Sequence, residues 1–352
     1  MEAWSVVSHG EALQKIQREI PAPTGTQVII KVTHCGICHS DLHLWDGFFE
    51  LGGGKKFYFA ERGVKLPVAV GHEILGIIAA KGPDVKDVEV GERRIVYPWI
   101  GCGECKKCKL GQDNMCLKQQ SLGIHLDGGF ASHVVVKHSK YLVDPGDLDP
   151  AIACTFGCSA ITVLNAIKKA RLEEMEPEES VVVIGAGGLG LTAVAALKAR
   201  GHQNIISVDI DPVKREVAIK TGASAAVDGK ADDAMQQVLS VSGGPVPAVI
   251  DFVNNSQTAK LAYDLLIKGG KLVQVGVGGG ELTVSLAMQI LKALTVVGNL
   301  TGNLEDLKEV TRLAKEGKWA PIPITKISSE KADEALMSLR DGKVTGRLIL
   351  TW

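Results

Sequence analysis

The most distinctive chemical feature of the sequence is a group of four closely spaced cysteines: Cys102, Cys105, Cys108 and Cys116. Their thiolates can fill all four positions around a tetrahedral zinc, and interleaved glycines allow the tight turns that bring the sulfurs together. Because no position is left for substrate, we expect a structural zinc site. Four unrelated buried cysteines and a zinc ribbon for nucleic acid are the weaker alternatives. A formal net charge of −1 gives no bulk attraction to polyanions.

A second motif, Gly185-x-Gly187-x-x-Gly190, follows the apolar run VVVI and opens a helical stretch. Such glycines allow a tight turn and let a pyrophosphate approach the helix N-terminus. Asp209 ends the next expected strand, 19 residues past the last glycine. A carboxylate there binds the ribose hydroxyls of the adenosine half, so the motif predicts dinucleotide binding. A glycine-rich contact between helix and strand is the alternative.

Two further segments carry groups that could bind a metal. HCGICHSDLH (34–43) contains the pattern of c-type haem attachment and a thioredoxin-like Cys-x-x-Cys. Gly71-His72-Glu73 stands beside an apolar strand, with Cys38 upstream and Cys154 and Cys158 downstream. One histidine and two cysteines would leave an open position, as in catalytic zinc sites. Spacing alone does not choose among these possibilities.

The elements that must position these residues fall into two halves. In the first half, short strands separated by Gly/Pro turns predict an irregular β domain, with strands at 26–33, 74–80, 93–97 and 133–137. From about Cys158 onward, helical stretches alternate with apolar strands at 181–185, 204–210, 225–229, 248–253 and 271–277. This alternation predicts a doubly wound parallel α/β sheet. Leu304 to Lys318 is expected to form an amphipathic helix.

Length and composition agree with two globular domains. The 352 residues are 45% hydrophobic and 22% charged, which provides a sizeable core and excludes extended disorder. The first residues show no secretory pattern. Ser180–Leu197 has 18 residues without a charge, which we interpret as a buried strand, turn and helix, not a membrane span. Eight cysteines without a secretion signal favour a reducing, cytoplasmic location.

Taken together, the sequence resembles the zinc-dependent alcohol dehydrogenases of the medium-chain dehydrogenase/reductase superfamily. The resemblance rests on the four-cysteine segment and five motifs in family order: GxCHxDxH at 36–43, GHE at 71–73, CxxITV at 158–163, GAGGLG at 185–190 and GKVTGRLIL at 342–350. It covers essentially the whole chain. It implies a GroES-like catalytic domain of residues 1–157 and 301–352, and a Rossmann coenzyme domain of residues 158–300.

The resemblance also assigns ligands and their partners. The catalytic zinc would be held by Cys38, His72 and Cys158. With the structural site, this implies two zinc ions per chain. Cys35 and Cys154 then become bystanders, which removes the haem and redox interpretations. Asp41 would accept the other imidazole N–H of His72, and Glu73 would lie behind the metal.

The implied reaction is reversible, NAD-dependent oxidation of a primary or secondary alcohol to an aldehyde or ketone. Zinc would lower the pKa of the alcohol, Ser40 would touch its oxygen, and His43 would pass the proton to solvent. Trp45 and Trp99 would line the substrate pocket. The implied cofactor contacts are His39, Thr162, Gly185, Gly187, Gly188, Leu189, Gly190, Asp209, Lys214, Val275, Val277, Asn299 and Arg347.

Some alternatives remain open at this point. Residues 47–67 form a longer segment than in the short microbial alcohol dehydrogenases, either a solvated loop or a lid over the pocket. An NADPH-preferring aldehyde reductase and a non-catalytic zinc protein are the rival functions. We expect a homodimer or homotetramer with a small alcohol or aldehyde substrate, and neither nucleic acid nor membrane as partner.

Overall fold

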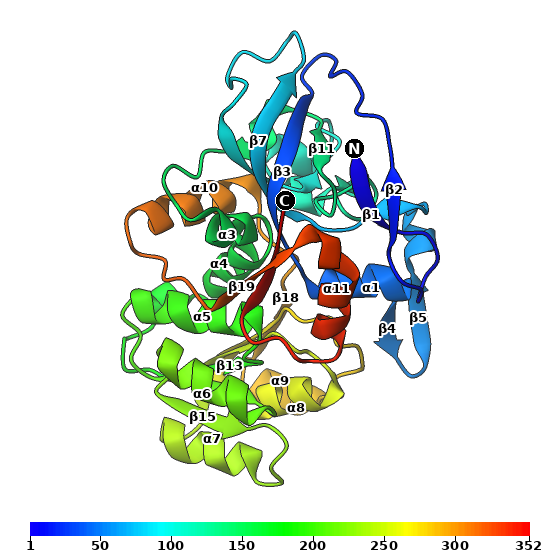
Figure 1. Cartoon of the computed structure of the whole chain (residues 1–352). Coiled ribbons are helices and arrows are strands. Elements are labelled where there is room, and N and C mark those ends of the chain that lie inside the picture. Colours follow the sequence, from blue (N-terminus) through cyan, green and yellow to red (C-terminus); the bar gives the residue numbers. More distant parts are fainter.

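The second half of the chain forms a six-stranded parallel sheet, the lower body in Figure 1. Its strands follow the order β15 (Ala225–Asp228), β14 (Ile205–Asp209), β13 (Val181–Ile184), β16 (Val246–Asp251), β17 (Leu266–Gln274) and β18 (Thr295–Gly298). The order reverses between β13 and β16, and ligands bind at such switch points in doubly wound sheets. Every residue of β13 is buried, as expected for a strand covered on both faces. The predicted Rossmann-type fold is confirmed.

Helices connect and cover these strands. They are α4 (Ser159–Ala170), α5 (Gly188–Ala199), α6 (Pro212–Thr221), α7 (Ala234–Ser242), α8 (Ser256–Asp264) and α9 (Leu286–Leu291). The uncharged stretch 180–197 is β13 followed by α5, so its interpretation as strand, turn and helix is confirmed. No single helix has the length and apolar character of a membrane span. Only the helical segments Pro150–Gly157 and Ser159–Ala170, taken together, reach that length and apolar composition, and they are bent by 55° relative to each other.

The other half is built on a mostly antiparallel, seven-stranded sheet, the upper body in Figure 1. Its main path is β12 (Leu142–Val143), β8 (Arg93–Val96), β7 (Glu73–Lys81), β3 (Val28–Gly36), β20 (Arg347–Thr351) and β19 (Ile324–Ser328), and β11 (His133–Val136) also pairs with β3. The chain therefore returns from the parallel sheet to complete the first one. Leu350 pairs with Cys35, and this register carries Arg347 to the residues that follow β3.

Smaller elements surround this sheet. They are β1 (Glu2–Val6), β2 (Gln14–Gln17), β6 (Val68–Ala69), α1 (His39–Asp46), β9 (Trp99–Ile100), α2 (Lys106–Lys109), β10 (Gln120–Ser121), α3 (Pro150–Ala153), α10 (Leu304–Lys315) and α11 (Ala332–Arg340). The long segment 47–67 contains a hairpin, β4 (Phe48–Gly52) and β5 (Lys55–Tyr58), which projects beside α1 (Figure 1). The computed structural model describes residues 1–352 throughout.

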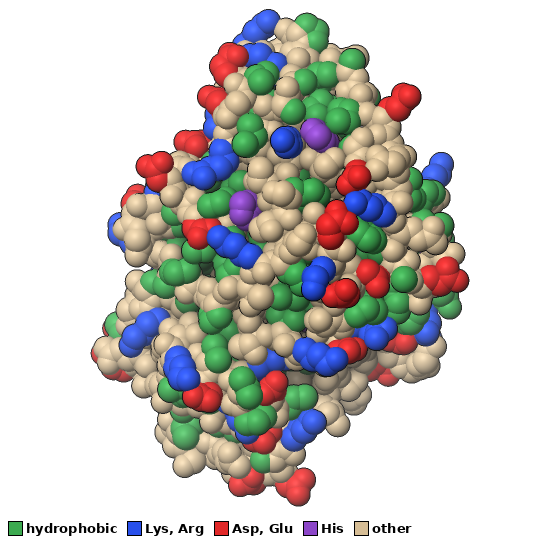
Figure 2. Space-filling view, in the orientation of Figure 1, with side chains coloured by type: hydrophobic (Ala, Val, Ile, Leu, Met, Phe, Trp, Pro, Cys, Tyr) green, Lys and Arg blue, Asp and Glu red, His purple; other side chains and the backbone are tan.

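A single large core joins the two halves. One cluster of 66 buried residues extends from the β domain through α4 to one face of the parallel sheet, and a second cluster of 15 covers the other face. Nine of the 12 residues of α4 are buried, so this helix is the packed element between the two sheets. Its N-terminus therefore has a fixed position at the junction. Acidic and basic side chains are interspersed over the face shown in Figure 2.

Candidate active site and metal centres

Three side chains from distant segments meet at the junction of the two halves: Cys38, His72 and Cys158. Cys38 precedes α1, His72 precedes β7, and Cys158 precedes α4. All three are buried, and their ligand atoms lie within 4.8 Å of one another. The antiparallel pairing of β3 with β7 aligns Gly36 with Glu73, which brings the first two ligands to the same end of the sheet. The packed N-terminus of α4 supplies the third.

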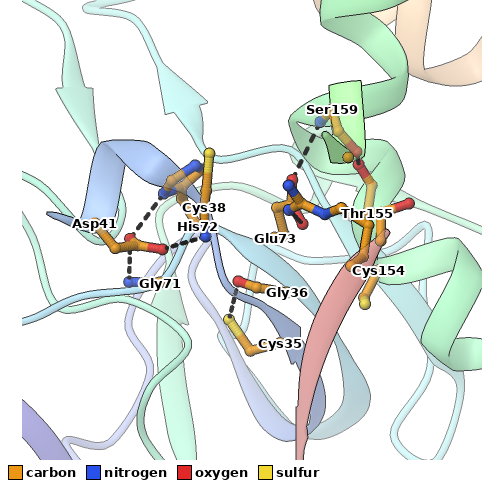
Figure 3. A network of polar contacts seen from close by, with 12 residues as sticks. Cys35, Gly36, Cys38, Asp41, Gly71, His72, Glu73, Cys154, Thr155 and Ser159 are labelled. Atoms are coloured by element: carbon orange, nitrogen blue, oxygen red, sulfur yellow. Dashed lines mark hydrogen bonds and ion pairs between the residues drawn. The ribbon is translucent and has the colours of Figure 1, made fainter. Parts of the chain in front are cut away.

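Hydrogen bonding around His72 fits a zinc ligand. Its Nδ1 lies 3.2 Å from Asp41 Oδ1, whereas its Nε2 is buried and has no partner (Figure 3). Asp41 is fixed in turn, because it accepts hydrogen bonds from the backbone N–H groups of Gly71 and Cys38, each at 2.9 Å. A buried ring nitrogen without a partner is unfavourable unless a ligand occupies it. Two sulfurs and this nitrogen fit zinc with a fourth position open.

The electrostatics of the three ligands favour a cation between them. The hydrogen bond from Cys158 and the proximity of His72 hold the pKa of Cys38 well below its usual value, despite burial. The same hydrogen bond, in which Cys158 keeps its proton, raises the pKa of Cys158 well above its usual value, and burial adds to this shift. Burial alone would lower the pKa of His72, but Asp41 and Cys38 raise it well above normal. A metal cation would relieve the repulsion between two thiolates held this close.

Glu73 and Arg347 form a buried ion pair behind this cluster. The other oxygen of Glu73 accepts a hydrogen bond from the Ser159 N–H at 3.2 Å. Burial raises the pKa of Glu73 to about 7, and the guanidinium opposes this shift. Arg347 also packs on α5, where a Cβ added to Gly188 would lie 2.3 Å from its Cδ. Arg347 thus lies between Glu73 and the N-terminus of α5, and the roles assigned to both side chains remain predictions.

Helix α1 presents Ser40 and His43, which are three residues apart and therefore on the same face. Ser40 Oγ lies 3.9 Å from Cys38 Sγ. The His43 ring is partly buried, with its centroid 5.0 Å from that of Phe49, and burial lowers the pKa of its imidazole. This row runs from the expected ligand Cys38 toward the partly exposed His43, which suits the predicted proton path.

The two tryptophans assigned to the pocket differ in position. Trp99 lies beside the cluster, with its ring centroid 5.3 Å from that of His72, and its N–H donates to the carbonyl of Gly157. Trp45 instead donates its N–H to the carbonyl of Glu11 and lies under the guanidinium of Arg340. It sits about 200° around α1 from His43, on the opposite face. The pocket role of Trp99 therefore stays a prediction, whereas Trp45 lies on the face of α1 opposite His43.

The four-cysteine lobe has the geometry of a closed zinc site. Cys105 Sγ lies 3.5 Å from Cys108 Sγ and 3.8 Å from Cys116 Sγ, and Cys102 Sγ lies 3.9 Å from Cys108 Sγ. Tetrahedral zinc with bonds of about 2.3 Å would separate its sulfurs by about 3.8 Å. Backbone N–H groups of Glu104 and Cys105 lower the pKa of Cys102 to about 6, which favours its thiolate. The four sulfurs therefore fit one zinc.

The glycine-rich turn has the shape of a phosphate cradle. Gly185 has a φ of +92°, and a Cβ at Gly190 would lie 1.6 Å from the Gly185 oxygen, so neither position tolerates a side chain. A Cβ at Gly187 would meet nothing within 4 Å, which leaves open space before α5. Asp209 Oδ2 accepts a hydrogen bond from the Ala186 N–H at 2.6 Å. The Asp209 carboxylate therefore lies against the turn, where it could accept hydrogen bonds from ribose hydroxyls.

The other expected cofactor residues lie on elements around the same junction. His39 is exposed at the start of α1, Leu189 is in the first turn of α5, and Val275 and Val277 follow β17. Thr162 is buried on α4, and its carbonyl accepts a hydrogen bond from Asn299 Nδ2 at 3.0 Å.

Comparisons with known proteins agree with this geometry. Residues 24–145 match the alcohol dehydrogenase GroES-like domain, and residues 188–316 match the zinc-binding dehydrogenase family. The chain is 36% identical to NAD-dependent alcohol dehydrogenases of Sulfurisphaera tokodaii and Saccharolobus solfataricus, with 99% of each chain covered. It belongs to the zinc-containing alcohol dehydrogenase family. The structure of the alcohol dehydrogenase from Aeropyrum pernix is similar over 100% of both chains, with a TM-score of 0.91 and 28% identity.

Membership in this family confirms the resemblance and the two-part fold expected from the sequence motifs, and it makes the chain an oxidoreductase. One residue beside the site escaped the sequence analysis. Asn254 follows β16 with a φ of +54°, and its amide bonds to the segment after β17. The Asn-Asn pair at 254–255 is a turn signal that could have identified it.

Proposed function

We propose that this chain is a zinc-dependent NAD(H) alcohol dehydrogenase. It would oxidise a primary or secondary alcohol to an aldehyde or ketone reversibly. The observation that carries the proposal is the buried, unpartnered Nε2 of His72, which shares one cluster with two cysteine sulfurs at the junction with the coenzyme domain. A zinc ion there would supply Lewis-acid polarisation of the substrate oxygen. The family members described above carry the same activity in their names.

Protein groups would perform the remaining tasks. Ser40 would accept the proton of the alcohol in a hydrogen bond, and His43 would pass it to solvent from the outer end of the same helix face. The N-terminus of α5 would hold the pyrophosphate, with Arg347 beside it. Trp99 would exclude water from the side of His72. The protein would thus place the reacting carbon against the nicotinamide and control one proton.

A screen of alcohols and aldehydes with both cofactors tests this function most directly. We expect zinc-loaded protein to reduce NAD with at least one primary or secondary alcohol, and to carry two zinc ions per chain by metal analysis. Active protein with one zinc or none would contradict the two-site assignment. Protein with both zincs that binds NADH but turns over no alcohol or aldehyde would contradict the activity.

Asp209 supports a preference for NAD over NADP. A 2′-phosphate would lie beside this carboxylate, and two unit charges about 4 Å apart repel by about 4 kcal/mol at an effective dielectric near 20. Salt and water reduce this, so we expect a preference of roughly 10- to 1,000-fold in kcat/KM. Arg215 already pairs with Asp228 and the Asp209 carbonyl, which leaves Lys214 as the neighbouring base without an ion-pair partner. This arrangement disfavours the NADPH-dependent alternative.

The measurement is kcat/KM for both cofactors in the wild type and in Asp209→Gly. We expect the variant to shift toward NADP. Lys214→Ala in the same background should reverse part of any gain, because Lys214 is the base free to reach the phosphate. Equal use of both cofactors by the wild type would refute the role of Asp209.

A homodimer or homotetramer is the assembly we propose. The stretch from α9 to Leu300 exposes Leu286 at 77%, Ile290 at 77%, Leu291 at 68% and Leu300 at 56%. Strand β18 is also an edge strand, paired on one side only with β17. Contiguous exposed apolar side chains beside an open sheet edge mark a protein interface. Ile290→Lys should lower the mass measured by light scattering, whereas Val90→Lys, on an exposed loop, should not.

The cytoplasm is the location we propose for the enzyme. All eight cysteines are free thiols, and six of them belong to the two ligand clusters. Thiolates can ligate zinc only while they remain reduced, as they do in that compartment.

A further inference from the structure

The segment 275–281 follows β17 at the C-terminal edge of the parallel sheet and carries Val275 and Val277, two of the expected cofactor contacts. Four of its seven residues are glycine. Such a chain has much conformational freedom to lose when it closes on a ligand. Contacts that already hold the segment in place would therefore raise the affinity for that ligand.

Within the coenzyme domain, Asn254 ties this segment to β16 and β17. Its Nδ2 donates to the Gly276 carbonyl and its Oδ1 accepts from Gln274 Nε2, both at 3.0 Å. Buried Asp251 fixes Asn254 itself, because one carboxylate oxygen accepts the N–H groups of Val253 at 2.9 Å and Asn254 at 2.8 Å. The turn thus holds the Asn254 side-chain amide where both its nitrogen and its oxygen are hydrogen-bonded.

From the catalytic domain, the tip of the β4–β5 hairpin reaches the other end of the same segment. A Cβ added to Gly52 would lie 2.6 Å from Glu281 Cγ and 2.8 Å from the Gly280 carbonyl carbon. A Cβ added to Gly279 would lie 2.6 Å from Glu50 Cβ. Packing alone joins the two, since no hydrogen bond or ion pair links hairpin and segment. The hairpin therefore contacts the coenzyme domain at the segment that carries Val277.

We propose that Asn254 and the hairpin tip position the 275–281 segment for the nicotinamide half of the cofactor. Asn254 acts through hydrogen bonds from within the coenzyme domain, and the hairpin acts through packing from the catalytic domain. Both are positioning residues, since neither is required to touch the cofactor. This proposal rests on the proposed NAD-dependent function, and it assigns the long segment 47–67 a role in holding cofactor.

The first test removes the amide and keeps the backbone. Asn254→Gly retains a residue that adopts positive φ readily, but it loses both side-chain hydrogen bonds. We expect the dissociation constant for NADH, measured by fluorescence titration, to rise about three- to tenfold. Asn204→Gly is the matched control, because it removes a side-chain hydrogen bond to the Glu178 carbonyl. Asn204 directly precedes β14, so it lies at the N-terminal ends of the parallel strands, away from the segment 275–281. The control should bind NADH like the wild type.

The second test separates the packing contact from backbone strain. Gly52 and Gly54 both have positive φ, +90° and +74°, but a Cβ at Gly54 would meet nothing within 4 Å. Gly52→Ala should weaken NADH binding about three- to tenfold and speed NADH dissociation in stopped flow, whereas Gly54→Ala should change neither by more than about 1.5-fold. Gly279→Ala, which pushes on the hairpin from the other side, should behave like Gly52→Ala.

The outcome that supports positioning is a raised KM for NAD, with kcat at saturating NAD, zinc content and melting temperature close to those of the wild type. Equal effects of Gly52→Ala and Gly54→Ala, or unchanged NADH affinity in Asn254→Gly, would overturn the proposal. Failure of the function itself is distinguishable, because it is read from the zinc-loaded wild type, which would then bind no NADH or bind it without turning over any alcohol or aldehyde.

Discussion

The two cysteine-rich centres of this protein are built in different ways. The four-cysteine lobe takes all its ligands from residues 102–116, and two of those cysteines are partly exposed. The second centre takes Cys38, His72 and Cys158 from three separate segments, and all three are buried. The lobe satisfies itself with four sulfurs, whereas the second centre leaves a histidine nitrogen without a partner beside the coenzyme domain.

This difference teaches where each centre acts. A set of ligands that is close in sequence can bind metal wherever its loop folds, so it stabilises the fold locally. A set assembled from three segments exists only when both halves of the chain are packed, so its open position is placed relative to the cofactor turn. We therefore expect the buried centre to act in the reaction, because its geometry depends on tertiary packing. We expect the four-cysteine lobe to act in stability, because its ligands are close in sequence.

The largest effect on activity is expected from removing a ligand of the buried centre. Cys38→Ala should lower kcat/KM at least about 10³-fold while the chain stays folded, because Lewis-acid assistance is worth several kcal/mol. Metal analysis should find one zinc per chain. Cys154→Ala is the control, since Cys154 is equally buried but bonds only to the Ala151 carbonyl. If Cys38→Ala kept more than a tenth of the activity, the buried centre would not be the catalytic one, and the proposed difference between the two centres would be wrong.

A smaller loss is expected when the support of His72 is weakened. Asp41→Asn should lower zinc affinity at the buried centre about 10- to 100-fold, because the carboxylate orients the imidazole and raises its basicity. Timed chelation with metal analysis should show that one zinc leaves early and the other as slowly as in the wild type. Loss of both zincs at the same rate would mean that Asp41 acts on the whole fold.

A variant of His43 tests whether the buried centre has a path for protons to solvent, which the four-cysteine lobe does not need. His43→Gln should lower alcohol oxidation roughly 10- to 100-fold, the low end of general acid–base effects or just below it. Burial lowers the pKa of His43, so its neutral, proton-accepting form persists to lower pH than in a free histidine. The wild-type rate should therefore fall only below the ordinary histidine pKa of about 6.5. The variant should lack this step and recover partly with buffer bases, and an unchanged pH–rate profile would count against the relay.

The smallest effect on activity is expected at the lobe. Cys105→Ala should keep kcat per zinc-loaded active site within about threefold, yet lower the melting temperature by roughly 8–16 °C, as loss of a structural metal can remove about 4 kcal/mol. Lys106→Ala, in the adjacent short helix, controls for surface changes. A variant that melts like the wild type, or that loses activity as Cys38→Ala does, would show that the two centres are not separable.

Much of this molecule is readable from its sequence. The parallel strands are continuous apolar runs between glycine turns, and β13, β14 and β16 appear within two residues of the expected bounds. The four cysteines and the glycine motif are local patterns, so their spacing alone predicted a zinc lobe and a dinucleotide turn. In these cases the interacting residues are close in the chain, and local stereochemistry determines their arrangement.

Other features were decided only by tertiary structure. Spacing could not choose between Cys154 and Cys158 as a ligand. The structure brings Cys158 to Cys38 and His72, and it leaves Cys154 bonded to a backbone carbonyl. Strands β19 and β20 went unrecognised because β20 pairs with β3, some 300 residues earlier, and β19 pairs only with β20. The same return of the chain pairs Arg347 with Glu73, 274 residues away.

Trp45 and the hairpin show the same limit. The family resemblance assigned Trp45 to the substrate pocket, but its contacts with Glu11 and Arg340 place it on the face of α1 opposite His43. The contact between Gly52 and Glu281 joins residues from opposite halves of the chain. The sequence by itself determined the elements and the locally encoded sites. Contacts between distant segments depend on how whole layers pack, so only the folded structure determined which of those residues meet.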